Sequence, residues 1–254
     1  MTTPAAIPDF VAVIPARYQS SRLPGKMLLD IAGKPMILHV VERVRQSHAR
    51  AVYVATDDDR IRAVCEAAGA NVCMTNPQHQ SGTDRIAEVA AQLGLASTAL
   101  VINVQGDEPL IPPAVINQLA ANLVSNADAG ICTLYADISE EAEFRNPNAV
   151  KLVTDGTGSV LYFSRAPIPW PRDGRVAGAP WGKRHLGIYG YRVEVLQQFV
   201  RWPASELEQT EKLEQLRAMH HGVRIHAERA CELIPPGVDT AEDLAAVRAL
   251  LATG

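Results

Sequence analysis

In the first half of the chain, short apolar runs rich in branched residues alternate with segments whose apolar positions recur at helical spacing. The runs that predict buried strands span residues 10–15, 51–56, 71–74 and 99–104. The segments that predict helices span residues 35–44, 58–68, 83–92 and 112–124. Strands that alternate with helices form right-handed βαβ units, so we expect a mainly parallel sheet with helices on both faces.

The pattern changes after Gly130, where strand-like runs follow one another without long helices between them. These runs span residues 131–135, 149–153, 159–163 and 187–192, and helical patterns return at 193–200, 208–220 and 240–251. A proline-rich stretch, residues 166–183, predicts a long loop. Its Trp170 and Trp181 would suit a contact between subunits, and a mobile loop is the alternative interpretation.

Composition and charge narrow the class of protein. The chain has 254 residues, 47% of them hydrophobic, and its 24 basic and 28 acidic residues give a net charge of -4. This composition is typical of a globular protein, and it offers no broad basic surface for nucleic acid. No apolar run approaches the ~18 residues of a membrane span, and we find no signal-peptide pattern. The four cysteines, at positions 65, 73, 132 and 231, form no C-x-x-C pair, so we expect reduced core thiols and a cytoplasmic protein.

A cationic loop follows the first predicted strand. Residues 15–26 contain Arg17, Arg22 and Lys26 together with the hydroxyls of Ser20 and Ser21. Ligands of such sheets bind beyond the carboxyl ends of the strands, and backbone N–H groups with Arg and Lys suit a triphosphate. The loop is not a P-loop, because Ser20 stands where that motif needs glycine, and the chain has no G-x-G-x-x-G.

Two distant acidic positions are candidates for a metal site. Asp107 follows the strand at 99–104, and Gly106 beside it would let the backbone turn close to a ligand. Mg²⁺ prefers one or two carboxylates together with phosphate oxygens and water. Asp239 is the second candidate, although Thr240 and Asp243 form a capping-box pattern that could equally explain its position at a helix start.

Other polar clusters have both a functional and a structural interpretation. The acidic triplet at 57–59 matches a D-x-D metal motif of glycosyltransferases, and helix capping explains it as well. The block at 81–85 would contact a base or ribose, or cap a helix. Taken alone, His185 is more typical of a structural histidine and Arg165 of a surface ion pair. The segment at 207–217 predicts one amphipathic helix.

Seven blocks, taken together, resemble a known family. They read A-R-x-x-S-x-R-L-P-G-K, S-G-T-D-R, V-Q-G-D-E-P, Y-F-S-R, H-L-G-I-Y-G-Y-R, L-E-x-x-E-x-L-E-Q-L-R and G-V-D-T in chain order. The sequence from residue 11 to residue 250 is similar to the 3-deoxy-manno-octulosonate (Kdo) cytidylyltransferases. It departs from the family at Met27, where proline is common, and at Pro235 and Pro236, which replace a glycine-containing approach.

The resemblance implies an α/β fold with a Rossmann-like, mainly parallel sheet of the nucleotide-diphospho-sugar transferase type and a smaller strand-rich capping and dimerisation region. It implies one domain, residues 1–254. In it, residues 1–130 would bind CTP, residues 131–235 would bind the sugar and form dimer contacts, and residues 236–254 would close the fold. The implied reaction transfers CMP from CTP to Kdo for lipopolysaccharide biosynthesis and releases pyrophosphate. The implied partners are CTP, Kdo and a second copy of the chain.

The resemblance also assigns roles to individual residues. It implies that Asp107 and Asp239 hold Mg²⁺ and that Lys26 and Arg17 assist catalysis. Implied nucleotide contacts come from Ala16, Arg17, Ser21, Arg22, Lys26, Gly82, Arg85 and Gln105. Implied sugar contacts come from Gln105, Arg165, His185, Tyr189, Glu214 and Gln215. The alternatives are a CMP-sialic acid synthetase, a glycosyltransferase that uses the acidic triplet, and a sugar-nucleotide-binding protein without enzyme activity.

Overall fold

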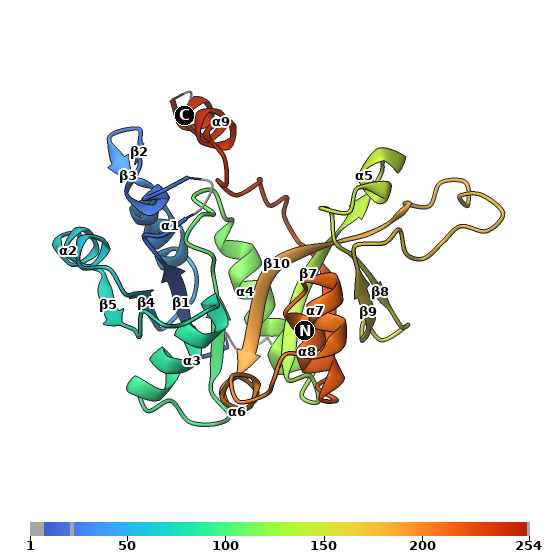
Figure 1. Cartoon of the computed structure of the whole chain (residues 1–254), viewed down its shortest axis with the longest axis horizontal. Coiled ribbons are helices and arrows are strands. Elements are labelled where there is room, and N and C mark those ends of the chain that lie inside the picture. Colours follow the sequence, from blue (N-terminus) through green and yellow to red (C-terminus); the bar gives the residue numbers. More distant parts are fainter. Residues whose placement is uncertain (1–7, 21–22, 253–254) are drawn as a thin grey trace, which may run out of the picture.

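The fold is built on one large twisted sheet (Figure 1). The computed structural model describes residues 8–20 and 23–252. Seven strands follow in the order β11-β7-β10-β6-β1-β4-β5, and two more, β8 and β9, extend it from β10. Their bounds are β1 Phe10–Ala16, β4 Ala51–Thr56, β5 Asn71–Met74, β6 Leu100–Asn103, β7 Ile131–Ile138, β8 Lys151–Thr154, β9 Val160–Ser164, β10 Gly182–Arg192 and β11 Ile225–Arg229.

The direction of the strands explains how the two halves of the chain share this sheet. β1 pairs in parallel with β4 and β6, β4 with β5, and β7 with β11. β10 runs antiparallel to both β6 and β7, and so joins the two parallel halves. The expected α/β fold with a mainly parallel sheet is therefore confirmed, and a small antiparallel hairpin of β2 (Asp30–Ile31) and β3 (Lys34–Pro35) lies outside it.

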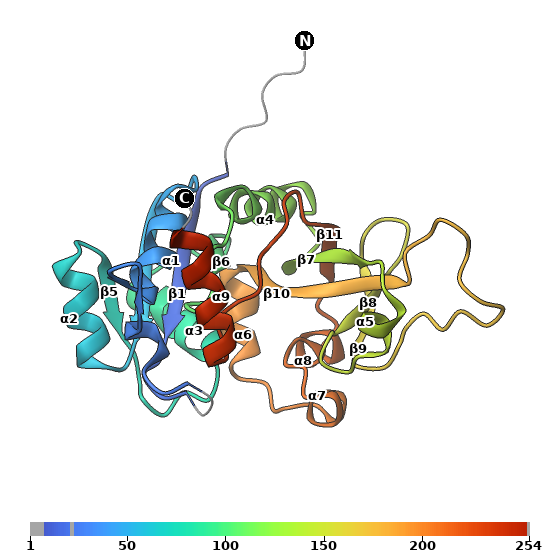
Figure 2. The same cartoon turned by 90° about the horizontal axis from the view of Figure 1, so that it is seen from above.

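Helices cover both faces of the sheet, as expected. One face packs against α1 (Met36–Arg45), α2 (Asp59–Ala67) and α4 (Pro113–Ser125), and α9 (Ala241–Ala252) joins the same apolar cluster beside β2. The other packs against α3 (Gly82–Gln92), α6 (Val193–Phe199) and α8 (Gln215–His220). Figure 2 shows α4 on one side of the strands and α6 and α8 on the other. Burial of both sheet faces explains why β1 is apolar throughout, with all seven residues buried.

The proline-rich stretch forms a loop that projects from the molecule beside β8, β9 and the short helix α5 (Glu141–Arg145) (Figures 1 and 2). We call residues 165–181 together with β8 and β9 the arm. Its base is fixed by Lys151, which is fully buried and whose ammonium donates to the carbonyls of Asn146, Ala149 and Arg165 at 2.9, 2.6 and 2.6 Å. Trp170, in the loop, is 59% exposed.

The predicted helix at 208–220 is wrong in one respect, because the structure divides it into α7 (Glu206–Glu211) and α8. Lys212 takes a left-handed conformation with φ of 53°, which stops the first helix. The break lets Leu213 become buried and turns Glu214 and Gln215 toward the sheet. Helical periodicity continues across this break, so the pattern of apolar residues does not indicate it. Periodicity also missed β11, α5 and the first residues of β10, which begins at Gly182.

Within the described residues, we find no helix whose length and apolar character would let it cross a membrane.

The cysteines give a first test of the fold. Cys65, Cys73 and Cys132 are buried, as expected, but Cys231 is exposed, because it follows β11 in an irregular segment at the surface. Burial raises the pKa of Cys65 to about 11 and of Cys132 to about 12, and it also raises that of Cys73.

A chromogenic disulfide reagent should therefore modify about one thiol rapidly in the native protein and all four after denaturation. Cys231→Ser should remove the rapid phase, and a rapid phase that survives this change would contradict the fold around Cys231.

Candidate active site

A polar cavity of about 400 Å³ lies where β1 and β6 end and α3 begins. Three segments identified in the sequence meet there: the cationic loop, the block at 81–85 and the acidic turn after β6. The cavity is lined by Pro15, Ala16, Arg17, Ser20, Lys26, Met27, His79, Gln80, Ser81, Gly82, Arg85, Gln105, Gly106, Asp107 and Asp239. The expected position beyond the carboxyl ends of the parallel strands is thus the position found.

At one side of this cavity, the Lys26 ammonium lies between two carboxylates. Its Nζ donates to Asp107 Oδ2 at 2.6 Å, to Asp239 Oδ1 at 2.9 Å and to the Val238 carbonyl at 3.2 Å. Burial tends to lower the pKa of Lys26, but the two carboxylates outweigh burial and raise it. The ammonium therefore stays charged, and it brings together the two aspartates that the sequence singled out as a metal pair.

The backbone around Asp239 explains how it can both adjoin a helix start and face Lys26. Thr240 and Asp243 cap α9, because Thr240 Oγ1 accepts from the Asp243 N–H and Asp243 Oδ2 accepts from the N–H groups of Asp239 and Thr240. The Val238 N–H donates to the Asp107 carbonyl at 2.8 Å. The capping interpretation is therefore correct for Thr240 and Asp243, while the Asp239 carboxylate binds Lys26.

Two glycines allow the main chain to come this close. A Cβ at Gly106 would lie 2.8 Å from the Pro15 carbonyl oxygen and 3.0 Å from Met27 Sδ, so no larger residue fits between β1 and the acidic turn. Gly25 has a positive φ of 67°, and a Cβ there would meet the Tyr18 ring at 3.0 Å. Met27, where the family more often has proline, is buried beneath this turn.

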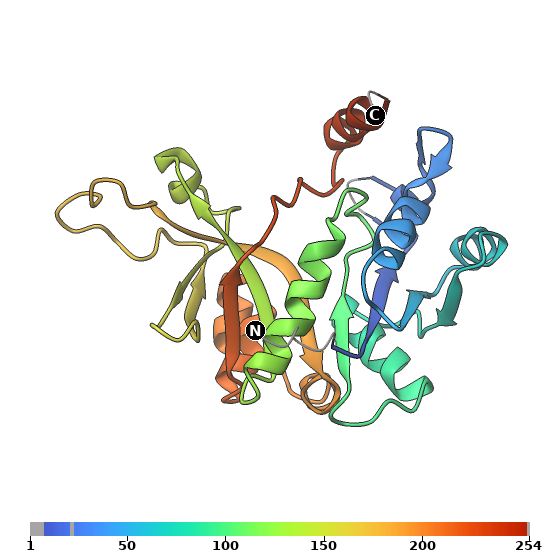
Figure 3. The same cartoon turned by 180° about the vertical axis from the view of Figure 1, so that it is seen from behind.

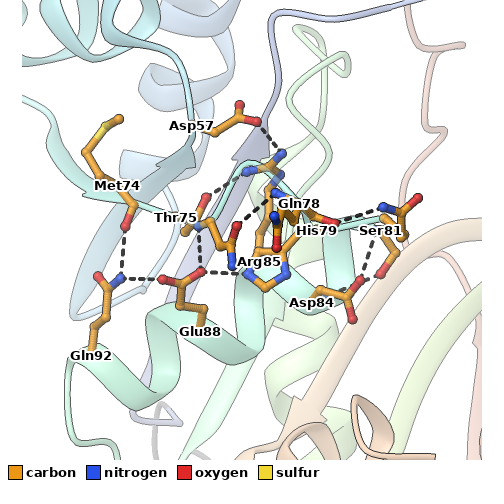
Figure 4. Close-up of polar contacts among 12 residues, drawn as sticks. Asp57, Met74, Thr75, Gln78, His79, Ser81, Asp84, Arg85, Glu88 and Gln92 are labelled. Atoms are coloured by element: carbon orange, nitrogen blue, oxygen red, sulfur yellow. Dashed lines mark hydrogen bonds and ion pairs between the residues drawn. The ribbon is translucent and has the colours of Figure 1, made fainter.

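The start of α3 also lines this cavity, and Figure 4 shows the polar contacts made there. Ser81 and Asp84 form a capping box, as the structural interpretation of this block predicted. Arg85 is buried, and its guanidinium donates to Thr75 Oγ1 at 2.7 Å and to Asp57 Oδ2 at 2.8 Å, so it lines the cavity in a fixed orientation. The capping interpretation of the acidic triplet is also supported, because Asp58 caps α2 while Asp57 binds Arg85.

His79 and Gln80 also line the cavity, and neither was predicted from the sequence. Figure 4 shows His79 together with Glu88. His79 Nε2 lies 2.6 Å from Glu88 Oε2, which also accepts from the Asn76 N–H at 2.8 Å. Burial acts to raise the pKa of Glu88, but these hydrogen bonds hold it below its usual value. The carboxylate therefore orients the loop that precedes α3.

A second cavity of about 300 Å³ adjoins the first, and both are lined by Gly82 and Gln105. Three residues that the resemblance assigned to the sugar, Tyr189, Glu214 and Gln215, lie here. The other lining residues are Thr83, Asn103, Ile131, Gly187, Tyr191 and Phe199. Of these, Asn103 could have been predicted as a site residue, because it is an amide at the end of an otherwise apolar strand.

The two cavities are linked through α3. Gly82 lines both of them, and the next residue, Thr83, is hydrogen-bonded through its hydroxyl to Glu214 Oε1. Burial raises the pKa of Glu214, and the Thr83 hydroxyl partly offsets this effect. A change at the start of α3 would therefore reach both cavities.

Two predicted sugar residues do not line either cavity in the described structure. The Arg165 guanidinium donates to the carbonyls of Glu211 at 2.6 Å and Pro147 at 3.0 Å, and so ties the arm to the end of α7. His185 lies 3.0 Å from Thr133 Oγ1 and lines a separate hollow near Gly237. Burial lowers the pKa of His185 to about 3, so its imidazole is neutral at physiological pH. The predicted nucleotide residues Ser21 and Arg22 lie outside the described residues.

Comparison with known proteins gives the family. A family model described as cytidylyltransferase matches residues 11–225. A 3-deoxy-manno-octulosonate cytidylyltransferase of Cellvibrio japonicus is 56% identical over 97% of this chain and 99% of its own length. One of Pseudomonas syringae pv. syringae is also 56% identical, over 95% of this chain and 98% of its own. This chain belongs to the 3-deoxy-manno-octulosonate cytidylyltransferase family.

Solved structures agree with the family. A CMP:2-keto-3-deoxy-manno-octonic acid synthetase in complex with CTP is 46% identical, with a TM-score of 0.89 over 96% of this chain and 99% of that one. A cytidylyltransferase from Leptospira borgpetersenii is 16% identical with a TM-score of 0.63, which shows a shared fold. The nucleotidyltransferase fold expected from the seven blocks is confirmed.

The family resemblance implied a magnesium ion, and the carboxylate pair fits one. Asp107 and Asp239 both bind the Lys26 ammonium, and both line a cavity that is also lined by Arg17 and Arg85. Oxygen ligands from one or two carboxylates, completed by phosphate and water, are the set that Mg²⁺ prefers.

The close approach at Gly106 can be tested by substitution. Gly106→Ala should lower the free energy of unfolding by roughly 1–3 kcal/mol, because the methyl group meets a backbone oxygen that cannot move without shifting β1. Gly156→Ala is the matched control, since its Cβ would have nothing within 4 Å. Thermal or denaturant unfolding measures both. Equal stability of the two variants would show that the turn after β6 is looser than described.

Proposed function

We propose that this protein transfers CMP from CTP to Kdo, giving CMP-Kdo and pyrophosphate. The observation that carries the proposal is the pair of adjoining cavities: one combines cations with two converging carboxylates, and the other is lined by hydroxyl and amide groups. Relatives that are 55–56% identical over nearly their full length bear the name of this activity. A CMP-sialic acid synthetase has no comparable support here.

The reaction needs positioning and charge neutralisation more than covalent participation by the protein. The anomeric hydroxyl oxygen of the sugar forms a bond to the α-phosphorus, the bond from this phosphorus to the bridging oxygen breaks, and pyrophosphate departs as the hydroxyl proton passes to water. We assign the phosphates to the first cavity, where Arg17 and Lys26 offset their charge, with Arg22 as a further predicted contact. The sugar lies in the second cavity, and Gln105 stands where the two substrates meet.

Asp107 and Asp239 would hold Mg²⁺, which supplies Lewis-acid polarisation of a phosphate oxygen when bound. The carboxylates also fix Lys26 next to the phosphate-binding part of the cavity. Arg85 is held by Asp57 and Thr75, so we assign it to the base or ribose side of the nucleotide. Arg165 and His185 would serve the sugar only after a shift that brings them to the second cavity.

The proposal predicts that both aspartates are essential. Asp107→Asn and Asp239→Asn should each lower kcat by at least ~100-fold, because each removes one charge from the cation site. Asp9→Asn, at an exposed carboxylate that pairs with Arg50, is the control and should keep full activity. The assay measures pyrophosphate release with CTP or UTP and with Kdo or sialic acid, with and without a chelator.

Several outcomes would contradict the proposal. A near-normal rate for either Asn variant at saturating Mg²⁺ would remove that aspartate from the site. Equal use of UTP, or a preference for sialic acid, would reject the assigned substrates. Release of a nucleoside diphosphate would indicate a glycosyltransferase, and nucleotide binding without turnover would indicate a binding protein.

We also propose that the protein acts in the cytoplasm, where CTP is available and thiols stay reduced. The product, a nucleotide-activated sugar acid, suits lipopolysaccharide biosynthesis. The described cysteines are all free, which is compatible with this location.

The arm supports a further proposal, that the protein is a homodimer. Leu161 and Trp170 are each 59% exposed and Val176 is 73% exposed, all within the arm. Large apolar side chains that are exposed on one part of a protein are typical of a surface that another molecule covers. A second copy of this chain is the occupant that we propose.

Light scattering after gel filtration tests the dimer. The protein should have twice the mass of the chain, and the double variant Leu161→Glu with Trp170→Glu should give monomers, because charges would replace the apolar contact. Leu233→Glu is the control, since Leu233 is 80% exposed but lies outside the arm. A monomeric parent protein, or an unchanged mass for the double variant, would reject this interface.

A further inference from the structure

Two buried amide side chains in the second cavity each leave one atom without a hydrogen-bond partner among the described residues. Asn103 is 2% exposed and its Oδ1 is unpaired, while Gln215 is 8% exposed and its Nε2 is unpaired. Both residues line the same cavity. Buried polar atoms are nearly always paired in proteins, and leaving one unpaired costs about 1–3 kcal/mol. Two such atoms at one cavity therefore indicate a ligand.

The two unpaired atoms have opposite character. Asn103 Oδ1 can only accept a hydrogen bond, and Gln215 Nε2 can only donate one. A hydroxyl group can do both, so an alcohol or a pair of neighbouring alcohols satisfies this arrangement. A carboxylate satisfies only the Gln215 end, and an ammonium only the Asn103 end.

The charge of the cavity leads to the same class of ligand. Among the described residues, its lining contains neither lysine nor arginine, and its single carboxylate, Glu214, is hydrogen-bonded to Thr83. Burial also raises the pKa values of Tyr189 and Tyr191, so both phenols stay neutral. An uncharged, hydroxyl-bearing part of a substrate fits here, whereas an anionic group would find its cations in the first cavity.

Asn103 is held rigidly enough to discriminate between ligands. It lies on β6, paired with Val13 of β1 on one side and Tyr189 of β10 on the other. A polar group on the central strand of a sheet loses little entropy when it binds a ligand.

We propose that Asn103 is a specificity-determining residue that accepts a hydrogen bond from one hydroxyl group of the acceptor sugar, while Gln215 donates to the same or the neighbouring hydroxyl. This inference rests on the proposed function of the two cavities. It assigns the hydroxyl-bearing face of the sugar to Asn103 and leaves the sugar carboxylate to the side that faces the first cavity.

The test compares Asn103→Ala with the parent protein on Kdo and on analogues that each lack one hydroxyl. With Kdo, the variant should raise the sugar KM roughly tenfold, as expected for one lost hydrogen bond, and leave the KM for CTP unchanged. One analogue should show the same sugar KM with parent and variant, because the hydrogen bond is already missing. The other analogues should keep the tenfold difference.

Asn117→Ala is the matched control. Its amide accepts from the His48 N–H at 2.8 Å and lies outside both cavities, so its kinetic constants should be those of the parent. Thermal unfolding of each variant checks the fold, and Asn103→Thr repeats the comparison at nearly unchanged side-chain volume if the alanine variant does not fold.

Two results would overturn the inference. An unchanged sugar KM for a folded Asn103 variant would show that the amide makes no hydrogen bond to the sugar. An equal rise in KM for Kdo and for every analogue would show a general effect of the substitution on the cavity. Failure of the proposed function has a different signature, because the parent protein would then release no pyrophosphate from CTP and Kdo.

Discussion

The contact of the Lys26 ammonium with two carboxylates is the interaction on which the rest of the site depends. Asp107 and Asp239 lie on segments far apart in the chain, and without a cation between them their charges would repel each other at close range. The same contact joins the cationic loop after β1, the turn after β6 and the segment before α9. The β-sheet supplies the framework because the carboxyl ends of β1 and β6 are neighbours, and Gly106 lets the two turns touch. Electrostatic attraction and close backbone packing therefore define one place for a cation.

The two cavities divide the chemistry between charge and hydrogen bonding. The first gathers cations and carboxylates, and the second has hydroxyl, phenol and amide groups, so each suits a different substrate. Gly82 and Gln105 belong to both walls, and Thr83 binds Glu214 directly. Because these contacts pass through the rigid first turn of α3, occupation of one cavity has a short physical route to the other. β10 has a similar role on the opposite side, since it joins the halves of the sheet and carries Tyr189 and Tyr191.

The sequence predicted most of the parallel half because alternating strands and helices leave a strong pattern, and β4 and β5 have the bounds that it indicated. It also identified Lys26, Asp107 and Asp239, whose residue types and positions after strands carry chemical meaning. Periodicity failed at Lys212, because a single left-handed residue ends a helix without changing the spacing of apolar side chains. The contacts of His79 with Glu88 and of Thr83 with Glu214 could not be predicted from the sequence, because they depend on the tertiary structure. Arg165 and His185 line neither cavity, so the contact with the sugar that the motifs imply for them stays a prediction.

The segment from residue 230 to residue 237 has a consequence for the integrity of the enzyme. It leads from β11 to the carboxylate pair without regular secondary structure, and Figure 3 shows it crossing from the sheet toward α9. Leu233, within it, is 80% exposed. A single cut by a protease in this strip would leave every strand of the sheet in place, yet it would sever the covalent link between β11 and Asp239. Asp239 would then stay beside Asp107 only if α9 remained bound to the rest of the protein through the buried side chains of Leu244 and Val247.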